Sequence, residues 1–299
     1  MTLDDQKQHR AGLFYVGVSA LLWSLSGLFM LSIKADLLTI VCLRGVVSGT
    51  SILLIFFYVE KERALPILLA MRGPTLAAAA LAAASMISGL SAIHYASAAE
   101  AMVIYATAPF MTAGIAFLFI REKASWTTLV ASFIACCGVM FMVTDNSGDG
   151  GSLLGKSLAI FMSLTVAGLA TVMRHYRNIQ MLPAMAAASF LCSLSTVWFV
   201  DLASVTGADL GLITLFGVVQ NACGLALYVV GSRRISAASA SLLTALEVPL
   251  TPLWTWVFMN DEPSYATLVG GSIVMVALFG HIVVEVRSSR GQPALAPVS

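Results

Sequence analysis

Charged residues are scarce in this sequence. Of its 299 residues, 16 are Lys or Arg and 15 are Asp or Glu, or 10% of the chain, whereas a typical soluble domain has about 25%. Hydrophobic residues account for 59%, and the mean hydropathy is +0.91. So few charges cannot cover the surface of a soluble fold, which excludes a water-soluble protein. The net charge of +1 offers no basic surface, and we expect no nucleic-acid partner.

Motifs for catalysis and nucleotide binding are absent as well. The sequence has no HExxH, no GxSxG and no phosphate-binding GxxxxGKS or GxxxxGKT. We therefore expect no enzyme and no cofactor, and ATP does not drive the protein directly. The five cysteines lie in apolar runs without the spacing of a metal site, so we expect no metal and interpret them as small packing residues. They are Cys42, Cys136, Cys137, Cys192 and Cys223.

Long apolar runs fill most of the chain. A membrane-spanning helix needs roughly 20 apolar residues, and the runs do not alternate as the strands of a membrane barrel would. The sequence therefore predicts an all-α membrane protein with ten transmembrane helices. The runs cover residues 12–33, 37–58, 75–95, 99–119, 126–143, 156–173, 183–203, 209–231, 238–258 and 266–286.

The basic residues predict the orientation of these helices. Cytoplasmic loops carry an excess of Lys and Arg. With the N-terminus inside, thirteen of the sixteen basic residues are cytoplasmic, only Lys34 and Lys156 lie outside, and Arg44 lies within a span. We expect both termini to be cytoplasmic and the chain to cross the bilayer of a bacterial inner membrane. The thirteen are Lys7, Arg10, Lys61, Arg63, Arg72, Arg121, Lys123, Arg174, Arg177, Arg233, Arg234, Arg287 and Arg290.

A shift of 140 residues brings the two halves into register. Pro109 and Glu122 are 13 residues apart, and Pro249 and Glu262 have the same spacing. Each repeat holds five predicted helices, an odd number, so the second repeat must be inverted. Inverted repeats are typical of secondary transporters. The predicted units are a first repeat over 1–143, a linker over 144–155, a second repeat over 156–286 and a cytoplasmic tail over 287–299.

These residues resemble the drug/metabolite transporter superfamily, in particular its ten-helix EamA-type members. The resemblance includes Leu22-Trp23-Ser24, Arg44, Pro109 through Glu122, and Leu246-Glu247-Val248-Pro249 through Glu262. In the family pattern Glu usually precedes Pro directly, whereas Val248 intervenes here. The resemblance implies export of amino acids, other metabolites or drugs by alternating access, with the nearest likeness to bacterial exporters of aromatic and other neutral amino acids. An intramembrane enzyme and an ion channel are remote alternatives. A monomer with a small-molecule substrate is expected.

Ionisable residues inside the membrane are costly and are functional candidates. Glu247 lies near the predicted centre of the ninth run, where it could couple protons or bind an amine, or could hydrogen-bond beside the break at Pro249. Arg44 could grip a substrate carboxylate with two hydrogen bonds, or could tie helices together through carbonyls or Glu100. His94 could titrate near neutral pH, or act as a hydrogen-bonding residue at the membrane surface.

Other polar and aromatic residues complete the candidate site. Gln220 and Asn221 are neighbours on one predicted helix and cannot both face lipid cheaply, so they join helices or line a cavity. Trp23 and Tyr105 are candidate walls for a substrate. Trp254 and Trp256 are expected in an interfacial aromatic belt.

Prolines and glycines mark places where helices bend or approach closely. Pro109, Pro249 and Pro252 interrupt helical hydrogen bonding and are candidate hinges. Gly45 and Gly49 form a GxxxG spacing, which predicts close helix packing.

Overall fold

The computed structural model describes residues 3–121, 126–144, 152–176, 181–232, 234 and 243–290. In these segments the chain is helical, with short turns between helices and no strand. This confirms the predicted all-α class. Within the same segments, seven helical stretches are long and apolar enough to cross a membrane, and the apolar helices Leu129–Phe141 and Tyr265–His281 are shorter. The exact number of membrane spans and the side on which the termini lie stay predictions.

Long helices and short helical pieces alternate along the first half of the chain. They are α1 (Leu3–Ser24), α2 (Ser26–Ser32), α3 (Leu37–Glu60), η1 (Lys61–Arg63), α4 (Ala64–Leu69), α5 (Gly73–Tyr95), α6 (Ala98–Tyr105), α7 (Ala108–Ile120) and α8 (Trp126–Thr144). The second half contains α9 (Leu153–His175), α10 (Met181–Thr196), η2 (Val197–Phe199), η3 (Leu202–Ser204), α11 (Gly207–Leu215), η4 (Phe216–Cys223), α12 (Gly224–Ser232), α14 (Glu247–Met259) and α15 (Tyr265–Arg290).

The predicted apolar runs fall on these helices, with differences at breaks and ends. The first run consists of α1 and α2, which meet at Leu25, and the fourth consists of α6 and α7. The structure begins α9 at Leu153, three residues before the predicted start, and extends α15 past the predicted end to Arg290. Glu122, and residues 237–239 that support the internal repeat, lie outside the described residues.

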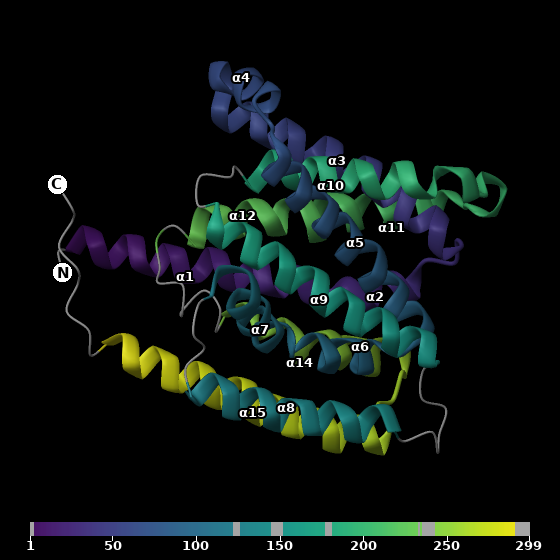
Figure 1. Cartoon of the computed structure of the whole chain (residues 1–299). Helices are drawn as coiled ribbons and strands as arrows, with labels where there is room; N and C mark the ends of the chain where they lie inside the picture. The colour runs from purple at the N-terminus through teal and green to yellow at the C-terminus, as the bar shows by residue number, and fades with distance from the viewer. Residues whose placement is uncertain are drawn as a thin grey trace.

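Most helix contacts join one half of the chain to the other. α5 packs on α9, and α12 packs on α1, so the third helix of each half contacts the first helix of the other. The pairs α3–α10, α6–α14 and α8–α15 join helices of equal rank in the two halves. Figure 1 shows α8 and α15 side by side, with the start of α1 and the end of α15 on the same side of the molecule. The hydrophobic core therefore lies between the halves.

The first helices of the two halves run in opposite directions. Near the end of the first run, Gly27 lies against Ala98 at the start of α6. Just before α9, the Ser152 hydroxyl donates to the carbonyl oxygen of Tyr95 at the end of α5. Since α5 and α6 meet at this point, α9 begins at the end of the molecule where α2 finishes (Figure 1).

Small residues let α3 and α10 approach closely. Gly45 faces the Ser189 carbonyl and the Ser193 hydroxyl, and Gly49 faces the ring of Phe190. The Ser193 Oγ also donates to the backbone carbonyl of Cys42 at 2.7 Å. The close packing predicted from the GxxxG spacing is confirmed.

The cysteines divide into two groups. Cys42 and Cys192 are buried and Cys223 is partly buried, as expected of packing residues. Cys136 and Cys137 are exposed on α8. The packing interpretation is wrong for these two, because they lie on the side of α8 opposite Ala135 and Gly138, which are buried, and Gly138 lies against α15.

Gly45→Leu is expected to destabilise the fold. Even a Cβ at this position would collide with the Ser189 carbonyl, which belongs to rigid backbone, and overpacking typically costs about 1–3 kcal/mol. We expect a lower unfolding midpoint for the purified protein in detergent, followed by tryptophan fluorescence. The control is Gly114→Ala, since a Cβ there meets nothing within 4 Å. Equal midpoints for the two variants would contradict the packing argument.

Candidate functional site

The helix that carries Gln220 and Asn221 changes its hydrogen bonding near its middle. α11 continues into the π-helical segment η4, and α12 follows without a gap. In a π-helix each amide bonds the carbonyl five residues earlier, and such segments are frequent at functional sites. Residues four and five positions apart then flank one face, so Phe216, Gln220 and Asn221 share a face and all three are buried. In an α-helix Asn221 would instead point about 140° away from Phe216.

Arg44 extends from α3 to this face of η4. Its Nη2 donates to Oε1 of Gln220 at 3.0 Å, and its Cζ lies 4.4 Å from the centre of the Phe216 ring. The side chain is 7% exposed, and its Nε has no acceptor among the described residues. Arg44 thus ties α3 to η4. The expected contact with Glu100 is wrong, because Glu100 lies on the first turn of α6 and pairs there with Lys156.

Gln220 also connects η4 to the end of α1. Its Nε2 donates to the backbone carbonyl of Trp23 at 3.3 Å. The Trp23 indole lies against Gly224, where a Cβ would come within 2.6 Å of Nε1. Only glycine at this position leaves room for the indole. The same indole lies 5.3 Å from the ring of Tyr228, measured between ring centres.

Asn221 holds three helices together. Its Nδ2 donates to the hydroxyl of Ser48 on α3, whose Oγ lies 3.5 Å from Oγ of Ser189 on α10. All three side chains are buried. Of the two roles that the sequence leaves open for Asn221, these contacts favour the joining of helices.

Glu247 is the first residue of α14 and lies near Tyr105. Tyr105, the last residue of α6, interacts electrostatically with Glu247 and with Tyr228. The Glu247 carbonyl accepts a hydrogen bond from Thr251 at 2.9 Å, whereas its carboxylate accepts none from the described residues. The side chains of Trp23, Tyr105, Tyr228 and Glu247 are all partly exposed. We call these four residues the central cluster.

The structure therefore brings three of the predicted residues together. Tyr105 interacts with both Glu247 and Tyr228, Trp23 packs against Tyr228, and Gln220 links Arg44 to the backbone of Trp23. Sequence reasoning missed Tyr228 and Phe216, since neither carries a charge that distinguishes it from the other aromatic residues of the apolar runs.

Trp254 also belongs near this region. Its indole Nε1 donates to the hydroxyl of the buried Ser24 at 2.9 Å. Its ring thus turns inward to this bond, and its place in an interfacial belt stays a prediction. Trp256 is 46% exposed and faces outward.

His94 lies apart from the central cluster. It is exposed on the last turn of α5, with its ring against that of Tyr95 at 4.9 Å between centres. The structure gives it no contact with the other candidates. No group of three or more His, Cys, Asp or Glu side chains that could hold a metal occurs in the described part of the chain.

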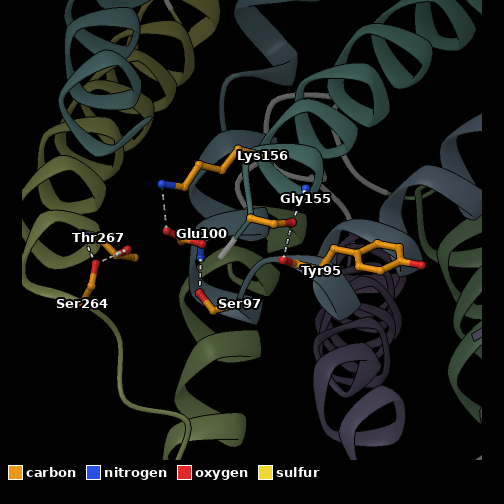
Figure 2. Close-up of polar contacts among 8 residues, drawn as sticks. Tyr95, Ser97, Glu100, Gly155, Lys156, Ser264 and Thr267 are labelled. Atoms are coloured by element: carbon orange, nitrogen blue, oxygen red, sulfur yellow. Dashed lines mark hydrogen bonds and ion pairs between the residues drawn. The ribbon is translucent and has the colours of Figure 1, made fainter. Parts of the chain in front are cut away.

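A buried ion pair joins the two halves at the end where α9 begins. Nζ of Lys156 on α9 lies 3.5 Å from Oε1 of Glu100 on α6, and the side chains are 4% and 3% exposed (Figure 2). Ser97 caps α6 by accepting from the Glu100 amide at 3.1 Å. Beside it, the hydroxyl of Ser152 caps α9 and donates to Tyr95. The charged pair is thus fixed by two capped helix ends.

Thr267 lies on α15 near the same ion pair (Figure 2). Its amide donates at 3.2 Å to Oγ of Ser264, the residue just before α15, and Thr267 is buried. The first turns of α6, α9 and α15 therefore meet at this end of the molecule (Figure 2).

The two halves match one protein family separately. A model of the EamA-like transporter family matches residues 10–144 and again residues 153–283. The chain belongs to the EamA-like transporter family. This confirms the resemblance inferred from the sequence, and it makes the protein a multi-pass membrane transporter for small molecules. Each match covers one half of the fold, so the family unit occurs twice in this EamA-like transporter.

Solved structures support the fold of this EamA-like transporter. One, titled "Crystal structure of protein", aligns with a TM-score of 0.65 and 14% identity, over 95% of this chain and 99% of the other. At this identity the likeness concerns the fold alone. No curated protein matches the chain.

Removing one partner of the Lys156–Glu100 pair is expected to destabilise the protein more than removing both. A buried charge left alone costs about 3–5 kcal/mol, whereas apolar replacement of a whole pair is often neutral. We expect Lys156→Met to lower the unfolding midpoint in detergent, and Lys156→Met with Glu100→Leu to restore most of it.

The matched control for this cycle is Lys61→Met, since Lys61 is exposed in η1. Two losses that simply add in the double variant would mean that the two charges are not coupled.

Proposed function

We propose that the protein is a secondary transporter that exports small metabolites, chiefly aromatic and other neutral amino acids, across a bacterial inner membrane. The observation that carries the proposal is the central cluster, where the Glu247 carboxylate lies near Tyr105 with no hydrogen-bond donor among the described residues, and where Trp23 packs against Tyr228. A carboxylate accepts an ammonium group, and aromatic faces bind apolar and cationic groups. The cluster therefore suits the amino end and the side chain of a neutral amino acid.

The broken helices support a binding site at this place. α6 ends at Tyr105, and α14 begins at Glu247 after the turn at Ala245–Leu246. In secondary transporters, substrate sites are typically formed by discontinuous helices near the middle of the membrane. Two members of the central cluster thus lie where the backbone leaves the regular helix.

Two roles are open for Glu247, and both require its carboxylate. It binds the ammonium group of the substrate, or it exchanges a proton that drives export. Its first-turn position places the carboxylate at the amino end of α14, which attracts negative charge.

Alternating access requires places where helices bend. Pro109 lies in the first turn of α7, Pro249 in the first turn of α14, and Pro252 within α14. Proline lacks an amide hydrogen, so Pro252 removes a hydrogen bond within α14, whereas Pro109 and Pro249 stand where their helices begin again after a break. We assign hinges to the three prolines, about which the repeats over 1–143 and 156–286 rock in an inverted arrangement with both termini cytoplasmic. The working unit is a monomer.

Counterflow of amino acids in proteoliposomes tests the proposal. Vesicles loaded with unlabelled phenylalanine or threonine are expected to accumulate the labelled amino acid, with a rate that saturates as its concentration rises. Empty vesicles are the control. Conductance without saturation would indicate a channel and refute the transporter mechanism, and inhibition only by a cationic dye would indicate a drug exporter of the same fold.

Glu247→Gln is expected to abolish transport driven by a pH gradient. The amide of glutamine cannot take up and release a proton as a carboxylate does. Counterflow needs no net proton movement, so it continues in this variant if the role of Glu247 is proton coupling. Loss of counterflow as well would assign Glu247 to the ammonium group. Glu62→Gln is the matched control, since Glu62 is exposed in η1. An unchanged response to the gradient together with unchanged counterflow would exclude both roles.

A further inference from the structure

An arginine charge without a negative partner lies next to the central cluster. The Arg44 side chain is 7% exposed, and no carboxylate of the described residues lies within 4.0 Å of its guanidinium. Arginine remains protonated in proteins, and a buried charge is costly unless an opposite charge and hydrogen bonds compensate it. The groups that contact it, the Gln220 amide and the Phe216 ring, are neutral.

One edge of the Arg44 guanidinium is only half satisfied. Nε and Nη2 lie along the same edge of the planar group, and a carboxylate can bind this edge with both of its oxygens. Nη2 donates to Oε1 of Gln220, while the buried Nε has no acceptor in the described part of the chain. An amide offers one oxygen where a carboxylate offers two. Gln220 therefore leaves one hydrogen-bond position of this edge empty.

Aromatic rings fix the plane of the guanidinium. The Phe216 ring lies 4.4 Å from Cζ of Arg44, and the ring of Phe29 stacks on Phe216 with centres 5.1 Å apart and planes 12° apart. This stack keeps the edge of Arg44 in one orientation, as specific recognition requires. In such apolar surroundings a charge-assisted hydrogen bond is stronger than in water.

The half-satisfied edge connects to the central cluster. Gln220 bonds Arg44 through its oxygen and the Trp23 carbonyl through its nitrogen, and Trp23 packs against Tyr228. Arg44 and Glu247 do not form an ion pair with each other. Arg44 thus connects to the central cluster through Gln220 and Trp23, and among the described residues its charge has no partner of opposite sign.

We propose that the Nε–Nη2 edge of Arg44 binds the carboxylate of the transported solute. The proposal rests on the proposed function, because it places the second charged end of the solute beside the central cluster. It assigns the substrates to carboxylate-bearing molecules with an apolar or aromatic part. An inorganic anion such as chloride carries the same sign of charge as a carboxylate, and separate titrations with each tell the two ligands apart.

Calorimetric titration of the purified full-length protein in detergent tests this site with four probes. Phenylalanine carries both charges, phenylalaninamide lacks the carboxylate, 3-phenylpropanoate lacks the amine, and sodium chloride supplies an inorganic anion in otherwise chloride-free sulfate buffer. We expect phenylalaninamide to bind roughly tenfold or more weakly than phenylalanine, as loss of a charge-assisted hydrogen-bonded pair implies. Chloride is expected to show no saturable binding.

Variants of Arg44 assign this difference to the guanidinium. In Arg44→Gln the affinities for phenylalanine and phenylalaninamide are expected to converge. Arg44→Lys keeps the charge but lacks the planar edge, so it recovers only part of the difference. Arg63→Gln, at an exposed position in η1, is the control and keeps the full difference. If Arg44→Gln does not fold, Arg44→Lys and the four probes on the unmodified protein still test the site.

Four results would overturn the proposal. They are equal binding of phenylalanine and phenylalaninamide to the unmodified protein, an undiminished difference between them in Arg44→Gln and Arg44→Lys, Arg44-dependent binding of chloride alone, and no binding of any carboxylate probe. Arg44-dependent binding of 3-phenylpropanoate without transport of phenylalanine or threonine would support the carboxylate site and refute amino-acid export. The two proposals can therefore fail separately.

Discussion

Backbone hydrogen bonding is the constraint on which the rest of this structure depends. In apolar surroundings an unpaired amide or carbonyl is costly, so a chain with so little charge must pair these groups within helices. The described residues follow this rule and depart from it at few places. These include the break at Leu25, the turn at Ala106–Thr107, the segment η4 and the start of α14. A member of the central cluster, or the polar pair of η4, lies beside each departure. Irregular backbone and chemically useful side chains therefore occur together.

Close helix packing is the second condition for the site. The indole of Trp23 fits because position 224 has no side chain, and α3 reaches α10 because Gly45 lies opposite a serine carbonyl. Gly217 of η4 packs in the same way against Val47 of α3. These contacts fix the helices that carry Arg44 and Gln220, so the polar groups meet at defined distances although no strand or disulfide holds them.

The helices and part of the site follow from the sequence, because long apolar runs have one stable solution in a membrane. Against such a background an ionisable residue stands out, which identifies Arg44 and Glu247. Tyr228 gives no comparable signal among the other aromatic residues. The segment η4 is not predictable from α-helical spacing, which would not place Phe216, Gln220 and Asn221 on one face. The partner of Lys156 is also hidden, since it lies on a helix far away in the sequence.

The π-helical segment η4 also sets the rotation of the helix that follows it. It fits one residue more into its turn than an α-helix does, so a return to α-helical hydrogen bonding would rotate α12 by about 100° and shift it by about 1.5 Å. That rotation would remove Gly224 from Trp23, break the 2.8 Å hydrogen bond from Ser19 to the Gly224 carbonyl, and move Gly231 away from Tyr15. All three contacts are made to α1. η4 can therefore return to α-helical hydrogen bonding only when α1 and α12 separate. The contacts with α1 thus keep α12, which continues from the segment that carries Gln220, from rotating about its axis.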